Sequence, residues 1–518
     1  MFKYLSISFF LILSGCSRSP APPATRPLHL NISQDPSTLD PRKAGDFSSS
    51  TLTFFLYEGL MRCTPNAIYE PALAERFEVQ NRGLTYIFHL KKAFWSDHTP
   101  ITAYDFERSW KEILDPKFPC PRADLFYSIV GAEDSKKGIG TKENIGIKAI
   151  DAYTLRVDLK HPAPYFLELT AFCTFFPYKE LESSIPLYSG PYRLKDYKTK
   201  DHIDLEKNPT YWGTEKVKLE QIQIFLVDDS VTALEMFERG EIDILGPPFT
   251  TLPPDSLPII KKQYELESLD TAGTVFLCFN NLSKYFKNEK LRQAFLLSID
   301  RKDLVENLTF LNETVATSLL PPMLQKGKES QYVWITDRKK ARELFKEALE
   351  ELQLSKEDLK IRFTYSPYSV DGVFSQIGQA IQEQLRVSLD IHIQMEQLEH
   401  KVYLDRLHKR DFDISGSFIL AQYLDPLAYL ERFKSKTNLR NYPAFEDPLY
   451  SSLLERANQT YSSKEREKLL AQAEKILIES ANLFPLYHCR NGYVVSKKIK
   501  NLKSFPSGWL FLEEVEIL

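Results

Sequence analysis

Residues 84–106 read LTYIFHLKKAFWSDHTPITAYDF, and this stretch contains two successive patterns of secondary structure. Its first part carries an apolar residue at every second position from Leu84 to Leu90, which predicts a half-buried β-strand. Thr102 then predicts the start of a helix that continues to Leu114, where an Asp-Pro pair follows as a stop signal. The stretch therefore predicts a strand followed by a helix.

Outward from this stretch, short apolar runs alternate with helical patterns along most of the chain. The run 221–245 predicts a strand, a helix and a strand in succession, which is the pattern of a βαβ unit. A second succession of this kind, over 361–395, predicts another α/β domain. We expect strands at 28–32, 221–227, 242–245, 274–279, 361–365 and 389–395, two strands within 147–159, a hairpin at 191–205, and helices at 51–61, 231–239, 290–298, 341–352, 374–385 and 469–477.

The first sixteen residues have the pattern of a bacterial lipoprotein signal peptide. A positive start at Lys3 precedes an apolar run of about ten residues, too short at about 15 Å to cross a bilayer core of about 30 Å. The box Leu-Ser-Gly-Cys ends at Cys16, and its resemblance to the lipoprotein cleavage box implies cleavage before Cys16 and lipid attachment to its sulfur. Residues 1–16 are thus expected to be a signal peptide and the proline-rich 17–27 a tether. The mature protein would lie in the cell envelope, lipid-anchored to the inner or outer membrane and facing the periplasm; the alternative is an uncleaved signal with a chance cysteine.

Composition narrows the class of protein further. About 500 mature residues exceed what one core usually serves, so two or three domains are expected. The net charge is −4 and no block is strongly basic, which argues against a nucleic-acid partner. The 34 Phe and 26 Tyr suit a protein that encloses something between aromatic walls.

The remaining cysteines number five, so at least one of them is unpaired within the chain. Their wide spacing without a CxxC motif argues against a metal cluster or a redox motif. They are expected to be small buried hydrophobic residues, with room for one disulfide that the sequence cannot assign. These residues are Cys63, Cys120, Cys173, Cys278 and Cys489.

Enzyme motifs are missing from the sequence. The nine histidines form neither HExxH nor a His-x-His pair, and no GxSxG, Walker or GxGxxG pattern occurs. We therefore expect no catalytic residues, no metal and no cofactor.

A dozen short segments, in order along the chain, resemble the extracellular solute-binding proteins of family 5, the peptide-binding lipoproteins of bacterial ABC importers. They include the 84–106 stretch itself, with its Trp95-Ser96-Asp97 turn, and the segments that precede and follow it. The others are Asp40-Pro41, Tyr57 to Leu60, Pro71 to Glu75, Gly190 to Leu194, Asn208 to Trp212, Gly240 to Asp243, Leu291 to Ala294, Ser298 to Arg301 and Pro321-Pro322.

This resemblance implies an α/β periplasmic-binding-protein fold of two lobes that close on a ligand by a hinge. The first lobe would combine 28–57, 183–268 and 489–518, with an inserted subdomain at 58–182, and the second lobe would span 269–488. It also implies the function of a substrate-binding lipoprotein that captures oligopeptides and delivers them to an inner-membrane ABC permease with its ATPase, as a monomer. Two alternatives stay open: the same fold with a dipeptide, cell-wall peptide, nickel complex or haem complex as cargo, or an envelope sensor or adhesin without transport.

The ligand site is expected along 413–426, DISGSFILAQYLDP, which resembles the ligand-edge strand of the family. Peptides share a backbone and charged termini, so a receptor can add them as a strand and pair their termini with opposite charges. The family has an Asp for the ligand ammonium where this chain has Gln422, often an Arg at Gly416, a Gly at His98 and a Tyr where Arg122 stands. Arg122 would favour a ligand carboxylate, and Asp425 has helix capping as an alternative role. The predicted ligand-binding residues are Asp46, Phe47, Arg122, Phe418, Ile419, Leu420, Gln422, Tyr423 and Asp425.

Overall fold

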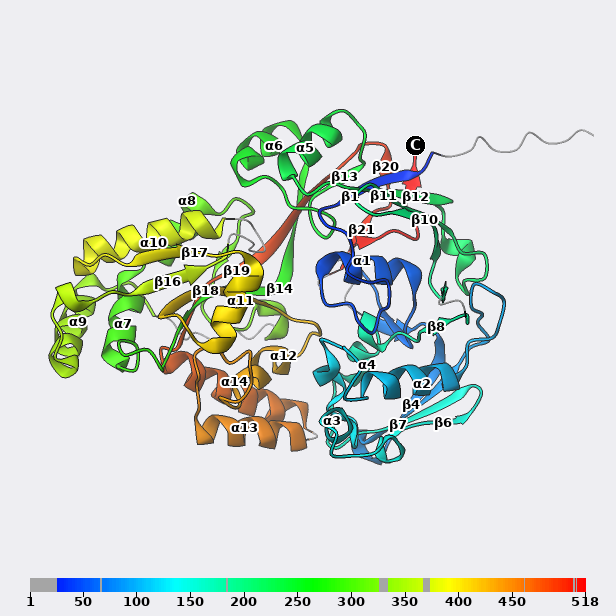
Figure 1. Ribbon diagram of the computed structural model, residues 1–518, viewed down its shortest axis with the longest axis horizontal. Coiled ribbons are helices and arrows are strands. Elements are labelled where there is room, and N and C mark those ends of the chain that lie inside the picture. Colours follow the sequence, from blue (N-terminus) through cyan, green and yellow to red (C-terminus); the bar gives the residue numbers. More distant parts are fainter. Residues whose placement is uncertain are drawn as a thin grey trace, which may run out of the picture.

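The computed structural model describes residues 26–518, apart from 66–67, 183–184, 326–333, 367–372, 461, 506–507 and 509. The predicted signal peptide, Cys16 and most of the tether lie outside these residues. Two bodies built of helices and sheets lie side by side, and the two long strands β14 (Leu266–Phe279) and β19 (Leu483–Val495) run between them (Figure 1). This arrangement confirms the expected α/β fold of two lobes.

The first-lobe sheet has the strand order β1-β12-β11-β10. Strand β1 runs parallel to β12, whereas β11 is antiparallel to both β12 and β10. The hairpin expected at 191–205 is confirmed by the β10–β11 pair, with a bulge between Leu194 and Asp196. The strands are β1 Leu28–Ile32, β10 Tyr192–Lys198, β11 His202–Lys207 and β12 Gln221–Leu226.

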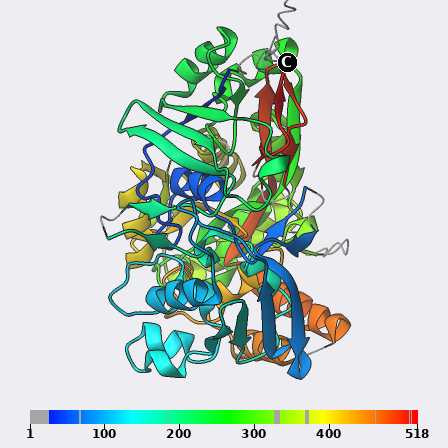
Figure 2. The same ribbon diagram turned by 90° about the vertical axis from the view of Figure 1, so that its right-hand side faces the viewer.

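Strand β5, which comes from the 84–106 stretch, is a central strand of a second sheet. We call it the inserted sheet, and its strand order is β4-β5-β7-β6. Both expectations for the stretch are confirmed: β5 is the strand, and α2 is the helix, opened by a capping box in which the backbone N–H of Thr102 donates to Asp105 at 2.9 Å. Figure 2 shows this sheet below the first-lobe sheet. The elements are β4 Ala74–Gln80, β5 Thr85–Leu90, β6 Ile147–Asp151, β7 Thr154–Asp158 and α2 Ala103–Ile113.

The second-lobe sheet has the order β13-β19-β14-β18-β16-β17, with β15 added on β19. Strands β16 and β17 are parallel and are joined by α10, so the βαβ unit predicted over 361–395 is confirmed, although α10 continues to Leu389 before β17 begins. The elements are β13 Ile244–Leu245, β15 Thr314–Val315, β16 Arg362–Tyr365, β17 Gln394–Gln397, β18 Ile414–Leu420 and α10 Phe374–Leu389.

The βαβ unit predicted over 221–245 is wrong. Strand β12 belongs to the first-lobe sheet, whereas β13, which follows α5 (Ser230–Glu238), pairs with β19 in the other sheet. The chain therefore crosses between sheets here instead of returning to the one it left. An apolar run shows that a strand is buried but not which strand it pairs with, so the local pattern could not distinguish the two outcomes.

The other helices and short strands complete the two bodies. Helices α7, α9 and α10 pack together on the second-lobe sheet. Within the described residues, no helix combines the length and the apolar character that crossing a bilayer requires. The remaining elements are α1 Phe47–Leu56, α3 Ala132–Lys136, α4 Phe166–Leu169, α6 Leu257–Gln263, α7 Glu289–Ser298, α8 Arg301–Leu308, α9 Arg338–Leu352, α11 His400–Lys409, α12 Leu427–Leu430, α13 Pro448–Gln459, α14 Ser463–Glu479, β2 Met61–Cys63, β3 Tyr69–Pro71, β8 Lys179–Glu180, β9 Pro186–Leu187, β20 Ile499–Lys500, β21 Lys503–Ser504, β22 Leu510–Phe511 and β23 Glu516–Ile517.

None of the five cysteines in the described residues forms a disulfide. Cys173, Cys278 and Cys489 are buried in hydrophobic cores, as expected of small hydrophobic residues. Cys63 and Cys120 are partly buried. The disulfide that the sequence left open is therefore not formed in the part of the chain that the structure describes.

Candidate ligand-binding site

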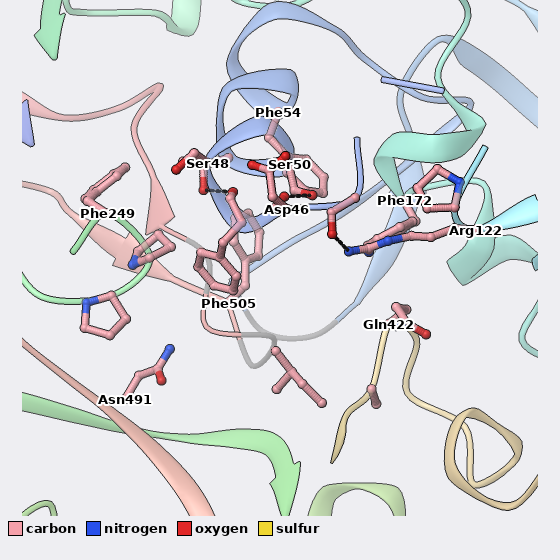
Figure 3. A pocket seen from close by; sticks show the side chains of 18 of the residues that line it. Asp46, Ser48, Ser50, Phe54, Arg122, Phe172, Phe249, Gln422, Asn491 and Phe505 are labelled. Carbon is pink, nitrogen blue, oxygen red and sulfur yellow. Dashed lines mark hydrogen bonds between the residues drawn. The ribbon is translucent and has the colours of Figure 1, made fainter. Parts of the chain in front are cut away.

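A cavity of about 1150 Å³ lies between the two lobes. Its walls come from segments far apart in the sequence, including α1, the segment 247–251, α11, strand β18 and the C-terminal segment 510–513. Figure 3 shows aromatic, hydroxyl and charged side chains that face this space. We call it the interlobe cavity.

Strand β18 presents a free edge to this cavity. One of its edges is paired with β14 along its whole length, from Ile414 to Leu420. Its other edge is paired with β16 only at Ile414 and Ser415, so in the described residues no strand covers that edge from Gly416 onward. Phe418, Ile419 and Leu420 line the cavity on this uncovered part. The arrangement can accept an extended ligand as an additional strand.

Seven of the nine predicted site residues line the same cavity. They come from three places in the sequence, which shows that the fold brings the N-terminal, inserted and ligand-edge segments together. These residues are Asp46, Phe47, Arg122, Phe418, Ile419, Leu420 and Gln422.

Tyr423 and Asp425 do not line the cavity, which corrects the expectation that they contact a ligand. The ring of Tyr423 stacks on that of Tyr165, with centroids 4.7 Å apart, and so joins the second lobe to the inserted subdomain. Asp425 is buried and accepts two hydrogen bonds from Arg466, at 2.7 and 2.9 Å. It also accepts the backbone N–H of Leu427 at 3.0 Å, at the start of helix α12. These contacts fit the alternative role of Asp425, helix capping, better than contact with a ligand. Strand β18 ends at Leu420, Ala421 and Gln422 still line the cavity, and the residues after Gln422 leave it.

Asp46 is the N-cap of α1 and carries a fixed negative charge at the cavity wall. Its carboxylate accepts the backbone N–H and the hydroxyl of Ser49, both at 2.7 Å, and the hydroxyl of Ser37. Burial by itself would raise the pKa of Asp46, but these hydrogen bonds outweigh it and lower that pKa below its usual value. The carboxylate is therefore ionised, but its oxygens are already engaged by the chain.

A polar cluster that sequence reasoning missed lies at the first-lobe end of the cavity. Arg62 forms an ion pair with Glu513, and Tyr211 donates to Glu58 at 2.8 Å. Burial raises the pKa of Glu513. Because Arg62 and Glu513 are 451 positions apart, no local motif could join them, and the cluster pairs its charges internally.

Three more arginines line the cavity, and we call them the arginine cluster: Arg122, Arg432 and Arg440. The guanidinium of Arg122 donates to the carbonyl of Gly45 at 3.3 Å and lies 5.1 Å from the ring centre of Phe172. Sequence reasoning found Arg122 by its departure from the family pattern but missed the other two, which no motif singles out.

The positive charges of Arg432 and Arg440 have weak ion-pair partners, or none, among the described residues. Arg440 lies 3.8 Å from Asp124, a distant ion pair. The buried Nε atom of Arg432 has no hydrogen-bond partner, and its guanidinium takes part in no ion pair among the described residues. Burial, with a contribution from Arg440, lowers the pKa of Arg432 to about 10, so it is still charged at neutral pH.

Two lobes with a cavity between them, and an uncovered strand edge in the cavity wall, form a site that fits a small solute. The family model of the bacterial extracellular solute-binding proteins, family 5, matches residues 69–441. The chain belongs to this family, whose members are binding proteins and not enzymes, as the sequence led us to expect.

Similar proteins support the same assignment. The chain is 33% identical to the oligopeptide-binding protein OppA of Bacillus subtilis, over 92% of this chain and 90% of that one, and 30% identical to the dipeptide-binding protein DppE of the same organism, over 94% and 91%. A solved structure of a periplasmic oligopeptide-binding protein, OppAIV, from Borrelia burgdorferi superposes with a TM-score of 0.82 at 26% identity, covering 95% of this chain and 99% of that one. The resemblance stated from the sequence motifs is thereby confirmed.

Proposed function

We propose that this protein is the receptor of a peptide importer, which captures short peptides between its lobes and delivers them to an ABC permease in the membrane. The observation that carries the proposal is the uncovered edge of β18 in the wall of the interlobe cavity. A peptide bound to that edge would pair the backbone N–H and C=O groups of alternate residues with the strand, whatever its side chains are. The names of the relatives, which include oligopeptide- and dipeptide-binding proteins, support this class of cargo.

We propose that the two lobes predicted from the family resemblance move relative to one another when a ligand binds. The first lobe, at 28–57, 183–268 and 489–518, would carry the inserted subdomain 58–182, and the second lobe, 269–488, would close on it. The seven predicted residues at the cavity wall would contact the peptide. The strands β14 and β19, which run between the two bodies, are where a hinge would act.

Peptide binding by the purified protein tests this function. We expect a pool of tripeptides to bind in calorimetry and to stabilise the protein by about 2.7 kcal/mol at a hundred times the dissociation constant. Small-angle scattering should show a more compact molecule with ligand than without it. A chain that neither compacts nor melts at a higher temperature with any peptide pool would not be a peptide receptor.

Gln422 is proposed to be the neutral partner of the peptide's amino end, where relatives have an acid. Gln422→Asp should strengthen the binding of tripeptides with a free amine by about 1–2 kcal/mol, because an ionised acceptor makes a stronger hydrogen bond to an ammonium group. N-acetylated tripeptides should be nearly unaffected, and calorimetry on matched free and acetylated peptides measures the difference. Asp425 cannot serve as the anchor instead, since Arg466 already occupies its carboxylate. Equal affinities for both peptide forms in both proteins would show that position 422 does not read the amino end.

We further propose that the mature protein is held at a membrane by lipid on Cys16. The support is the sequence alone: a short apolar run that ends in a lipoprotein cleavage box. The proline-rich segment 17–27 would then tether the receptor close to a permease in the membrane.

A further inference from the structure

The arginine cluster faces the cavity from both lobes. Arg122 comes from the inserted subdomain, at the start of the 3₁₀ turn Ala123–Phe126, whereas Arg432 and Arg440 come from the second lobe. The 3.8 Å approach of Arg440 to Asp124 shows that the two sides meet at this end of the cavity. Figure 3 shows Arg122 and Gln422 on segments that face one another. Asp124 is two positions after Arg122, so Arg440 lies close to the segment of Arg122.

The charges in this region are not paired one to one. Three carboxylates lie here: Asp46, which follows Gly45, the partner of Arg122; Asp124, which is half exposed; and Glu168, which accepts the backbone N–H of Leu424 at 2.6 Å. Gln422 adds no charge, and no hydrogen bond within the described residues uses its side chain. Arg432 therefore remains a guanidinium at the cavity wall that no carboxylate of the described residues pairs.

Closure of the lobes makes an unpaired guanidinium costly. Guanidinium groups from opposite lobes approach each other when the lobes close, and their repulsion grows as water leaves the space between them. The orphaned Nε of the half-buried Arg432 adds an unsatisfied donor at the same place. A ligand with a negative group at this position would satisfy the donor and bridge the two lobes, often with two parallel hydrogen bonds to one guanidinium.

We propose, resting on the peptide-receptor function above, that the arginine cluster is a carboxylate subsite that selects peptides with an acidic side chain near their amino end. This subsite carries positive groups, whereas a subsite that holds an ammonium group carries negative ones. The preferred ligands are thus short peptides with an acidic side chain near the amino end.

Three blocked tripeptides test the subsite by calorimetry: acetyl-Glu-Ala-Ala-amide, acetyl-Gln-Ala-Ala-amide, and acetyl-Gln-Ala-Ala with a free carboxyl end. We expect the first to bind about tenfold to a hundredfold more tightly than the second, since hydrogen bonds to a charged group are worth about 1.5–3 kcal/mol. Arg432→Gln and Arg440→Gln should each remove most of this preference. The preference should also shrink as ionic strength rises.

Arg386→Gln is the matched control, because it removes the same charge from the exposed surface of α10, where Arg386 pairs with Glu383. It should leave the preference for glutamate intact. If Arg432→Gln does not fold, Arg440→Gln decides the result, since the side chain of Arg440 is 38% exposed.

Two outcomes would overturn the subsite. Equal binding of the glutamate and glutamine peptides would show that the cluster does not read a side-chain carboxylate. Tighter binding of the peptide with a free carboxyl end would show that the cluster holds the peptide's carboxyl terminus instead. The peptide-receptor function would survive both, and it fails only if the unblocked tripeptide pool does not bind either.

Discussion

Replacing Asp425 with alanine should lower the free energy of unfolding by about 3–5 kcal/mol. Asp425 and Arg466 form a bidentate ion pair, and their side chains are only 8% and 7% exposed. Alanine would leave the guanidinium of Arg466 charged and buried without its partner, and would also remove the acceptor for the N–H of Leu427. Denaturant unfolding of the ligand-free protein measures the loss.

The double variant Asp425→Ala/Arg466→Met tests whether the loss of stability comes from the unpaired charge of Arg466. Methionine fills part of the space without a charge, so the double variant should be more stable than Asp425→Ala alone. A ligand-contact role for Asp425, which the sequence suggested, makes the opposite prediction. The single variant would then keep its stability and lose peptide affinity.

Replacing Cys16 with serine should move the protein almost completely from the membrane fraction to the soluble fraction. A serine hydroxyl cannot receive the thioether-linked lipid that the cleavage box implies. Each buried methylene of an acyl chain contributes about 0.8 kcal/mol, so several chains hold a protein firmly, whereas the variant would retain none on this residue. Fractionation of cells after a salt wash, followed by detection of the protein, measures the change.

Cys63→Ser is the matched control, because it removes a thiol from the folded part of the chain, on strand β2. This variant should stay with the membrane. If the Cys16→Ser protein still sediments with membranes after the salt wash, the lipoprotein assignment is wrong.

Local structure followed from the sequence wherever one short segment contains the whole cause. The strand and the capped helix of 84–106 are examples: alternating burial specifies β5, and the side chains of Thr102 and Asp105 satisfy the first turn of α2. The family motifs carried the fold further, because they come in the same order along both lobes. Phe418 and Gln422 were predicted in this way as ligand contacts, and both line the interlobe cavity.

Partners distant in the sequence were decided only by the tertiary structure. Strand β13 pairs with β19 rather than with β12, Arg62 meets Glu513, and Asp425 turns to Arg466. Each of these pairings depends on which surfaces meet when two lobes pack, and a local pattern of apolar and polar residues has the same form for every buried partner.

The charge at the ligand end shows the same division. The sequence by itself determined that Gln422 has no charge and that Arg122 does. Only the folded chain shows that Arg432 and Arg440 line the same cavity. An electrostatic site depends on the distances between charges in space and on their exposure to water, and both are set by packing and not by spacing along the chain.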